Sequence, residues 1–380
     1  MATSLYIHIP FCDQICSYCD FPKLFTKNQN IDEYIDALLI ELEIYKKKIG
    51  FSKLKTIYIG GGTPTVLSKD QLIRLFNYLH NNIDFTKLVE VSIESNPESL
   101  NCNELIACLL ACGVTRISIG VQTLQKKLLK ILERNHSKED IIDVIHKLST
   151  ANVEINIDMI YAIPTQTIHE LEDDINTLLS LPITHISAYS LILEEHTKFY
   201  KSYLNDELDL LDNDLEAQMF EKVIHSFKKA GYQHYEISNF TRDKRSYHNE
   251  TYWKNLPYIA VGLGAHGQII QNNSCMRYEN TRSINAYKKA LVRGELPVTN
   301  ARVLTRDEQI EESMFLGLRM MEGIDLAEMS TRYKTDVYAM YEKKIKKLLA
   351  LKLVTYEDFS LMLTDKGIML ANEVFEEMLL

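Results

Sequence analysis

Three cysteines stand close together near the N-terminus, at Cys12, Cys16 and Cys19, and their C-x₃-C-x₂-C spacing suits metal chemistry. Polar residues separate them, which argues against a chance group of core thiols. A structural zinc site normally takes four ligands in two separated pairs, and this sequence has no second pair of that kind. Iron–sulfur clusters are also held by cysteine thiolates, normally four. Three thiolates on one loop could ligate three irons of a [4Fe–4S] cube and leave the fourth iron open for a ligand.

The other four cysteines have a different setting. Cys102, Cys108 and Cys112 belong to a stretch with the apolar pattern of a helix, and Cys275 stands alone. Free cysteine is a common small buried residue, so packing is the simplest interpretation for these four. An odd total of seven also argues against a disulfide framework.

Composition predicts a globular protein with about two domains in its 380 residues, because 46% of them are hydrophobic. The formal net charge of −10 disfavours sequence-independent binding to nucleic acid, whose phosphates would be repelled. No apolar run approaches the roughly 20 residues that span a bilayer, and no secretory signal is visible. We therefore expect a cytoplasmic protein without a transmembrane segment.

Short β-rich runs alternate with amphipathic helical stretches over most of the chain. Six runs precede residue 200, at 5–9, 56–59, 89–93, 116–119, 153–160 and 185–193. Several are almost wholly apolar, as parallel strands buried on both faces should be. This pattern predicts a parallel α/β fold, either a partial barrel or a doubly wound sheet. Two further β-like runs follow at 234–240 and 258–263.

The sequence texture changes near residue 300. Residues 305–350 are helical in pattern, and the end of the chain reads as a short hairpin followed by a helix. We expect two domains, a core at 1–300 with an extension at about 234–300, and a mostly helical, winged-helix-like domain at 301–380. Four lysines at 343–347 could contact DNA, but a solvated helix face explains them more simply.

Polar residues follow several predicted strands at the point where each strand ends. Gly61, Gly62 and Thr63 follow the second strand, Glu94 ends the third, and Gln122 and Asp158 belong to the next two. Carboxyl ends of parallel strands meet at one edge, which is where such sheets bind ligands. Glycines there let a ligand approach the backbone with no Cβ in the way. The sequence therefore predicts one site at this edge.

The cysteine motif placed after the first strand of a βα series resembles the radical S-adenosylmethionine (SAM) superfamily. This resemblance implies a partial parallel (β/α)6 TIM-like barrel. It also implies that the open iron chelates SAM, which one electron then cleaves to a 5′-deoxyadenosyl radical. Cys12, Cys16 and Cys19 are the implied cluster ligands. The implied SAM-site residues are Tyr6, Gly61, Gly62, Thr63, Glu94, Gln122, Arg134 and Asp158, with Tyr189 and Ile192 around adenine.

The resemblance extends over nearly the whole chain to the oxygen-independent coproporphyrinogen III oxidase family. The motifs that carry it are LYIHIPFC, IGGGTP, ESNP, RISIGVQ and HNETYW. Within that family the chain is most similar to the heme-chaperone branch, which implies heme as a third cofactor. Phe21 stands where the oxidase has a fourth cysteine, and only five residues precede Tyr6 where the oxidase has an extension. The family usually has glycines where this chain has Ala162 and Thr165, which could alter SAM packing.

HNETYW matches the HNxxYW motif of the chaperone branch and suggests the heme site. Imidazole can ligate iron and aromatic side chains can cover a porphyrin, so His248 is the candidate ligand of the heme iron. Asn249, Tyr252 and Trp253 complete the candidate heme site. As an isolated feature, His248 would be read as an ordinary loop histidine.

Three functional hypotheses follow. The first is a heme chaperone that passes heme to an unidentified acceptor protein. The alternative is oxidative decarboxylation of coproporphyrinogen III by the deoxyadenosyl radical. A DNA-binding regulator built on the C-terminal segment is a third, which the charge of −10 disfavours. The sequence leaves the formation of a homodimer open.

Overall fold

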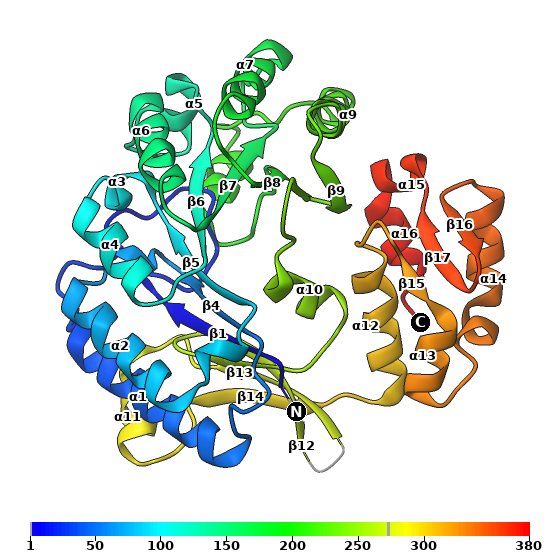
Figure 1. The fold of residues 1–380 in the computed structure, drawn as a ribbon. Helices are drawn as coiled ribbons and strands as arrows, with labels where there is room; N and C mark the ends of the chain where they lie inside the picture. The colour runs from blue at the N-terminus through cyan, green and yellow to red at the C-terminus, as the bar shows by residue number, and fades with distance from the viewer. Residues whose placement is uncertain (1, 272–273) are drawn as a thin grey trace.

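A 12-stranded sheet forms the larger part of the molecule and curves around helix α10 (Tyr247–Trp253) (Figure 1). The computed structural model describes residues 2–271 and 274–380. Its central strands lie in the order β1, β4, β5, β6, β7, β8, and each pair of neighbours is parallel. These six strands are β1 (Ser4–Ile9), β4 (Thr56–Gly61), β5 (Glu90–Ser95), β6 (Arg116–Gln122), β7 (Glu154–Tyr161) and β8 (His185–Ser190). The predicted parallel α/β fold with six βα units is confirmed.

Helices cover the outside of this sheet because each carries one apolar face. The long ones are α1 (Ile31–Lys48), α2 (Lys69–Asn82), α4 (Asn103–Ala111), α6 (Lys138–Ser149), α7 (Ile168–Leu179) and α9 (Asn213–Lys229). Shorter α3 (Pro97–Leu100), α5 (Lys126–Ile131) and α8 (Lys198–Leu204) lie after strand ends. Ser68 and Thr167 begin α2 and α7 with capping boxes, which satisfy backbone N–H groups at the helix starts.

Antiparallel strands extend the sheet at both sides. On one side β11 (Tyr258–Val261) pairs in parallel with β1, and β12 (His266–Gln271), β13 (Ser274–Asn280) and β14 (Val298–Val303) follow it antiparallel. On the other side the run predicted at 234–240 is a hairpin, not one strand. It consists of β9 (Gln233–Glu236) and β10 (Asn239–Thr241), with a bulge in the pairing. Among the described residues the outermost strands β14 and β9 do not pair, so the barrel is partial.

Helix α10 (Tyr247–Trp253), which contains the HNETYW motif, lies inside the curve of the sheet (Figure 1). Helix α11 (Ile284–Val292) packs outside, where Tyr287 stacks on Tyr34 of α1 at 5.4 Å between ring centroids. Short strands β2 (Phe11–Cys12) and β3 (Leu24–Phe25) pair at the two ends of the cysteine loop. That pairing holds the loop closed at its base.

The C-terminal part of the chain has its own apolar core, formed by buried residues between Ile310 and Met378. It begins with α12 (Arg306–Gly317), directly after β14 of the large sheet, so the sheet runs slightly past residue 300. The rest comprises β15 (Ile324–Asp325), α13 (Leu326–Tyr333), α14 (Val337–Ala350), β16 (Val354–Glu357), β17 (Ser360–Leu363), α15 (Asp365–Met369) and α16 (Ala371–Glu377). Helices followed by a hairpin and helices match the predicted winged-helix-like order.

None of the helices in the described ranges combines the length and apolar character that crossing a membrane requires.

Two residues after β7 have a backbone conformation that favours glycine. Ala162 has φ of 58° and Thr165 has φ of 67°. These are the positions where the sequence departs from the glycines expected there. The left-handed region costs a residue with a Cβ about 1–2 kcal/mol, and a β-branched residue is unusual in it. The loop thus keeps its glycine-like shape and stores strain at Thr165.

We predict that Thr165→Gly raises the free energy of unfolding by about 1 kcal/mol, because relief of strain exceeds the extra chain entropy of glycine. Denaturant titration measures the change. Thr331→Gly is the matched control, because Thr331 is exposed within helix α13 and glycine should destabilise that helix. If Thr165→Gly lowered the free energy of unfolding as much as the control does, Thr165 would not be strained.

Candidate functional site

The cysteine loop follows β1 at the carboxyl edge of the parallel strands. Cys12 is buried, while Cys16 and Cys19 are half-buried. Two donors from other elements point at the thiols: the Thr63 hydroxyl donates to Cys12 Sγ at 3.7 Å, and Arg134 Nη1 donates to Cys16 Sγ at 3.5 Å. Burial raises the pKa of the Cys12 thiol to about 11, so this thiol is protonated unless iron displaces the proton.

The surroundings of the three thiols suit metal-bound thiolates. No three His, Cys, Asp or Glu side chains of the described residues converge as the ligands of one metal ion would. A threonine hydroxyl and an arginine guanidinium directed at sulfur also suit thiolate ligation. Phe21, which stands where the oxidase has a fourth cysteine, is 61% exposed.

The glycine run at the end of β4 is required by close packing against the cysteine loop. Gly61 has φ of 117°, and a Cβ there would lie 2.5 Å from the His8 ring. A Cβ on Gly62 would lie 2.7 Å from the Phe11 carbonyl oxygen. The bare backbone of this turn therefore lies directly beside the residues that carry Cys12.

Glu94 is a half-buried carboxyl group beside that turn. It accepts hydrogen bonds from the Gly61 N–H at 2.8 Å and from the Tyr58 hydroxyl at 2.8 Å. Burial raises its pKa to about 7, although both donors act in the opposite direction and the nearby Asp158 adds to the increase. A carboxyl group with this pKa is suited to pair with a cationic ligand, which would favour its charged form.

Asp158 lies in the second half of β7, and Arg134 lies in the loop between α5 and α6. Asp158, whose pKa burial raises, accepts from the Ser118 hydroxyl at 2.7 Å. Arg134 Nη2 donates to the Gly120 carbonyl at 2.8 Å and to Asn96 Oδ1 at 2.9 Å. Gln122 has φ of 65° where the β6–β7 register shifts. The structure therefore brings the predicted residues of four strand ends to one edge.

Three further residues were predicted at the SAM site. Tyr6 stacks on Tyr58 with ring centroids 6.2 Å apart, and its hydroxyl hydrogen-bonds to His8 Nδ1 at 3.0 Å. Tyr189 is 40% exposed near the end of β8. Ile192, in the loop that follows, is 67% exposed, which makes it the most exposed of the residues predicted at the SAM site.

The residues predicted to hold heme all lie on α10, namely His248, Asn249, Tyr252 and Trp253. His248 is buried, with Nδ1 hydrogen-bonded to the Thr56 hydroxyl at 2.8 Å and Nε2 to the Tyr252 hydroxyl at 2.8 Å. Neither ring nitrogen is free for iron in this arrangement, which does not support the expected ligation. Trp253 is half-buried under the Arg319 guanidinium, 4.4 Å from its ring centroid, and Asn249 is also half-buried.

Two residues in contact with the site were not expected from the sequence. Tyr58 orients Glu94, and Asn96 links Arg134 to Thr63, whose hydroxyl accepts from Asn96 Nδ2 at 3.2 Å. A signal for Tyr58 did exist: it is a polar aromatic residue two positions before the glycine run in an otherwise apolar strand. Asn96 directly follows the Glu94-Ser95 strand end.

Comparisons with protein families match both parts of the chain. The model of the radical SAM superfamily matches residues 6–178, and that of the HemN C-terminal domain matches residues 304–370. Among solved structures, the coproporphyrinogen III oxidase HemN of Escherichia coli has the same fold. The TM-score is 0.83 at 22% identity, over 99% of this chain and 90% of the other.

Curated relatives cover the chain from end to end. The heme chaperone HemW of Lactococcus lactis is 40% identical over 99% of this chain and 97% of its own length. The heme chaperone HemW of Bacillus subtilis is 38% identical over 98% of each chain. At this identity over full length, the chain belongs to the HemW heme chaperone family of the radical SAM superfamily.

Proposed function

We propose that this protein is a heme chaperone that binds heme and passes it to an acceptor protein. The observation that carries the proposal is the full-length similarity to proteins named heme chaperone HemW, at 40% and 38% identity. The position of Phe21 supports the same branch, because an exposed phenylalanine stands where the oxidase has a further cysteine.

The proposal includes a resident [4Fe–4S] cluster held by Cys12, Cys16 and Cys19, with SAM beside it. A bound cluster would supply the open iron and the electron that SAM chemistry requires. The protein's own groups would hold SAM in place: Glu94 supplies a half-buried carboxylate, Gly61 and Gly62 supply bare backbone, and Asp158 supplies a second acidic group. The remaining predicted residues, namely Tyr6, Thr63, Gln122, Arg134, Tyr189 and Ile192, would line the same edge.

The heme site is proposed in less detail. Asn249, Tyr252 and Trp253 are half-buried on α10 and stay predictions as heme contacts. Iron ligation by His248 would require one of its two ring nitrogens to give up its hydrogen bond, either to Thr56 or to Tyr252. The acceptor is a protein whose identity the chain's chemistry does not specify.

The cluster assignment predicts a clear difference between cysteines. Cys12→Ala, Cys16→Ala and Cys19→Ala should each abolish stable iron and sulfide incorporation after anaerobic reconstitution, because each removes one of only three thiolates. Cys108→Ala is the control and should keep its iron, because Cys108 lies on helix α4, away from the cysteine loop. Full iron content in any of the first three variants would overturn the assignment.

The assignment of Glu94 predicts a pH dependence of SAM binding. The carboxyl group has a pKa of about 7 without ligand, and only its charged form attracts the permanently charged sulfonium. SAM affinity should therefore fall as pH decreases below 7, approaching about tenfold per pH unit. Equilibrium dialysis between pH 5.5 and 8 measures this. Glu94→Gln should bind SAM more weakly and with little pH dependence; an unchanged profile would exclude the charge interaction.

Heme chaperone activity predicts binding and direct transfer. Hemin titration should give a saturable Soret band, and the loaded protein should pass heme to a heme-free b-type cytochrome. Transfer should accelerate with acceptor concentration and exceed the dissociation rate measured with apomyoglobin as a trap. A transfer rate equal to that dissociation rate would contradict a chaperone function.

The oxidase alternative is distinguished from the chaperone proposal by its reaction product. Reconstituted protein incubated anaerobically with SAM, a reductant and coproporphyrinogen III should form no protoporphyrinogen, while its cluster stays intact. Turnover to that product would replace the chaperone proposal with the oxidase.

A further inference from the structure

Helix α10 closes the amino end of the barrel, opposite the cysteine loop. Thr251 hydrogen-bonds to Ser4 at 2.7 Å between hydroxyl oxygens, and His248 hydrogen-bonds to Thr56. Ser4 and Thr56 are the first residues of β1 and β4, whereas the cysteine loop follows β1 and the glycine run lies at the far end of β4. The HNETYW motif on α10 therefore lies inside the barrel at its amino end, on the side opposite the candidate SAM site.

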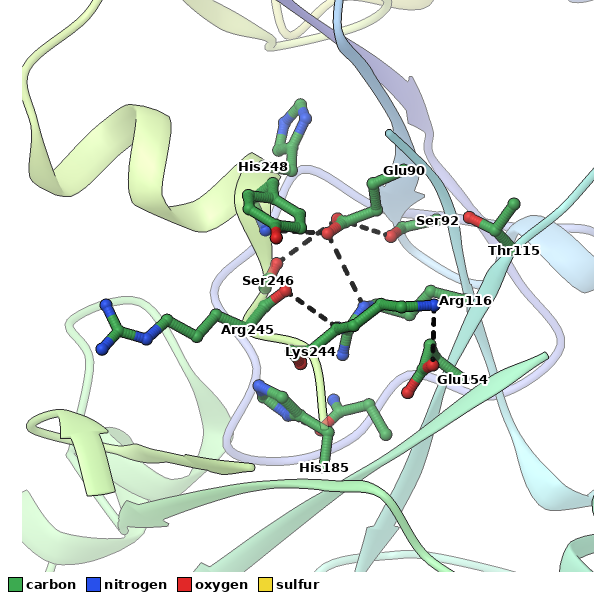
Figure 2. A network of polar contacts seen from close by, with 12 residues as sticks. Glu90, Ser92, Thr115, Arg116, Glu154, His185, Lys244, Arg245, Ser246 and His248 are labelled. Carbon is green, nitrogen blue, oxygen red and sulfur yellow. Dashed lines mark hydrogen bonds and ion pairs between the residues drawn. The ribbon is translucent and has the colours of Figure 1, made fainter. Parts of the chain in front are cut away.

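The start of α10 is fixed by a buried ion pair (Figure 2). Glu90 and Arg116, the first residues of β5 and β6, lie 3.7 Å apart and are both buried. Glu90 accepts from the Tyr247 N–H at 2.8 Å, at the N-terminus of the helix. Arg116 Nη2 donates to the carbonyls of Lys244 at 2.9 Å and Arg245 at 3.1 Å. Buried charges that hold backbone groups leave the helix little freedom.

His248 uses this fixed position to support Tyr58. Its ring lies 5.1 Å from the Tyr58 ring, between centroids, with an interplanar angle of 32°. Burial lowers the pKa of His248 to about 3, so the ring is neutral and offers one donor and one acceptor. The hydroxyls of Thr56 and Tyr252 satisfy both nitrogens, which fixes the plane of the imidazole.

The Tyr58 ring in turn lies next to the rings of both His248 and Tyr6, and its hydroxyl donates to Glu94. We infer that His248 is a positioning residue for SAM: it holds the Tyr58 ring so that the Tyr58 hydroxyl orients the Glu94 carboxylate. Ligation of heme iron would take a nitrogen away from that role. The inference rests on the SAM site of the proposed function and is independent of heme transfer.

SAM affinity is the measurement that tests it, by equilibrium dialysis on the full-length protein after cluster reconstitution. Tyr58→Phe, which removes one hydroxyl, and His248→Ala should each weaken SAM binding about tenfold, in line with one lost hydrogen bond to a charged group. The double variant should be little weaker than the worse single variant, because both changes act through Glu94. His248→Asn, which keeps a donor and an acceptor, should recover part of the affinity.

His146→Ala is the matched control, because His146 is exposed on α6, and it should bind SAM like the wild type. Hemin titration of His248→Ala should give the wild-type stoichiometry and Soret band. Unchanged SAM affinity in His248→Ala would overturn the inference, whether or not the Soret band is also lost, and unchanged affinity in Tyr58→Phe would remove the link through Glu94.

The two proposals fail in different ways. If His248→Ala does not retain iron, His248→Asn decides instead: it should bind SAM more weakly than the wild type, because the smaller amide supports the Tyr58 ring less well. If the wild type binds no heme, the chaperone proposal fails while the SAM measurements still test the role of His248.

Discussion

The parallel register of the central strands is the constraint on which the candidate site depends. Tyr6 lies opposite Tyr58 and His8 opposite Gly60, while Gly120 lies opposite Asp158. Side chains of a strand alternate between its two faces, so a shift of one residue would turn each polar group from the interior to the helix-covered side. The apolar residues that alternate with them, such as Ile57 and Ile59, are fully buried and oppose that shift. Packing of the core and placement of the site are thus specified together.

Much of this arrangement could be predicted from local sequence. The six strands are short apolar runs, and polar residues at the ends of parallel strands must meet at one edge. The departures at Ala162 and Thr165 were also visible in the sequence, although only the structure shows that both keep φ positive. Residues 234–240 were read as one strand because a bulged hairpin with almost no loop has the same composition.

The orientation of the His248 side chain could not be predicted, because it depends on contacts with residues distant in sequence. Its partner Thr56 is 192 residues away, and Glu90, which holds the start of α10, is 157 residues from Tyr247. A motif shows which residue types occur together, but not whether they face solvent or the sheet interior. Here a histidine beside aromatic residues suggested a ligand of heme iron, whereas its ring is buried at the amino end of the barrel.

The C-terminal part of the chain covers β9, the outermost strand at one side of the large sheet. Residues 235–237 of β9 and its turn exchange backbone hydrogen bonds with residues 319–321, from Ile237 N–H to the Arg319 carbonyl and from Met321 N–H to the Tyr235 carbonyl, each at 3.0 Å. Arg319 also covers Trp253 and pairs with Glu236 at 3.3 Å. An uncovered sheet edge is a template for aggregation. The C-terminal part therefore protects the outer edge of β9 from pairing with other chains. A chain shortened before residue 319 would expose that edge and the Trp253 indole to neighbouring molecules.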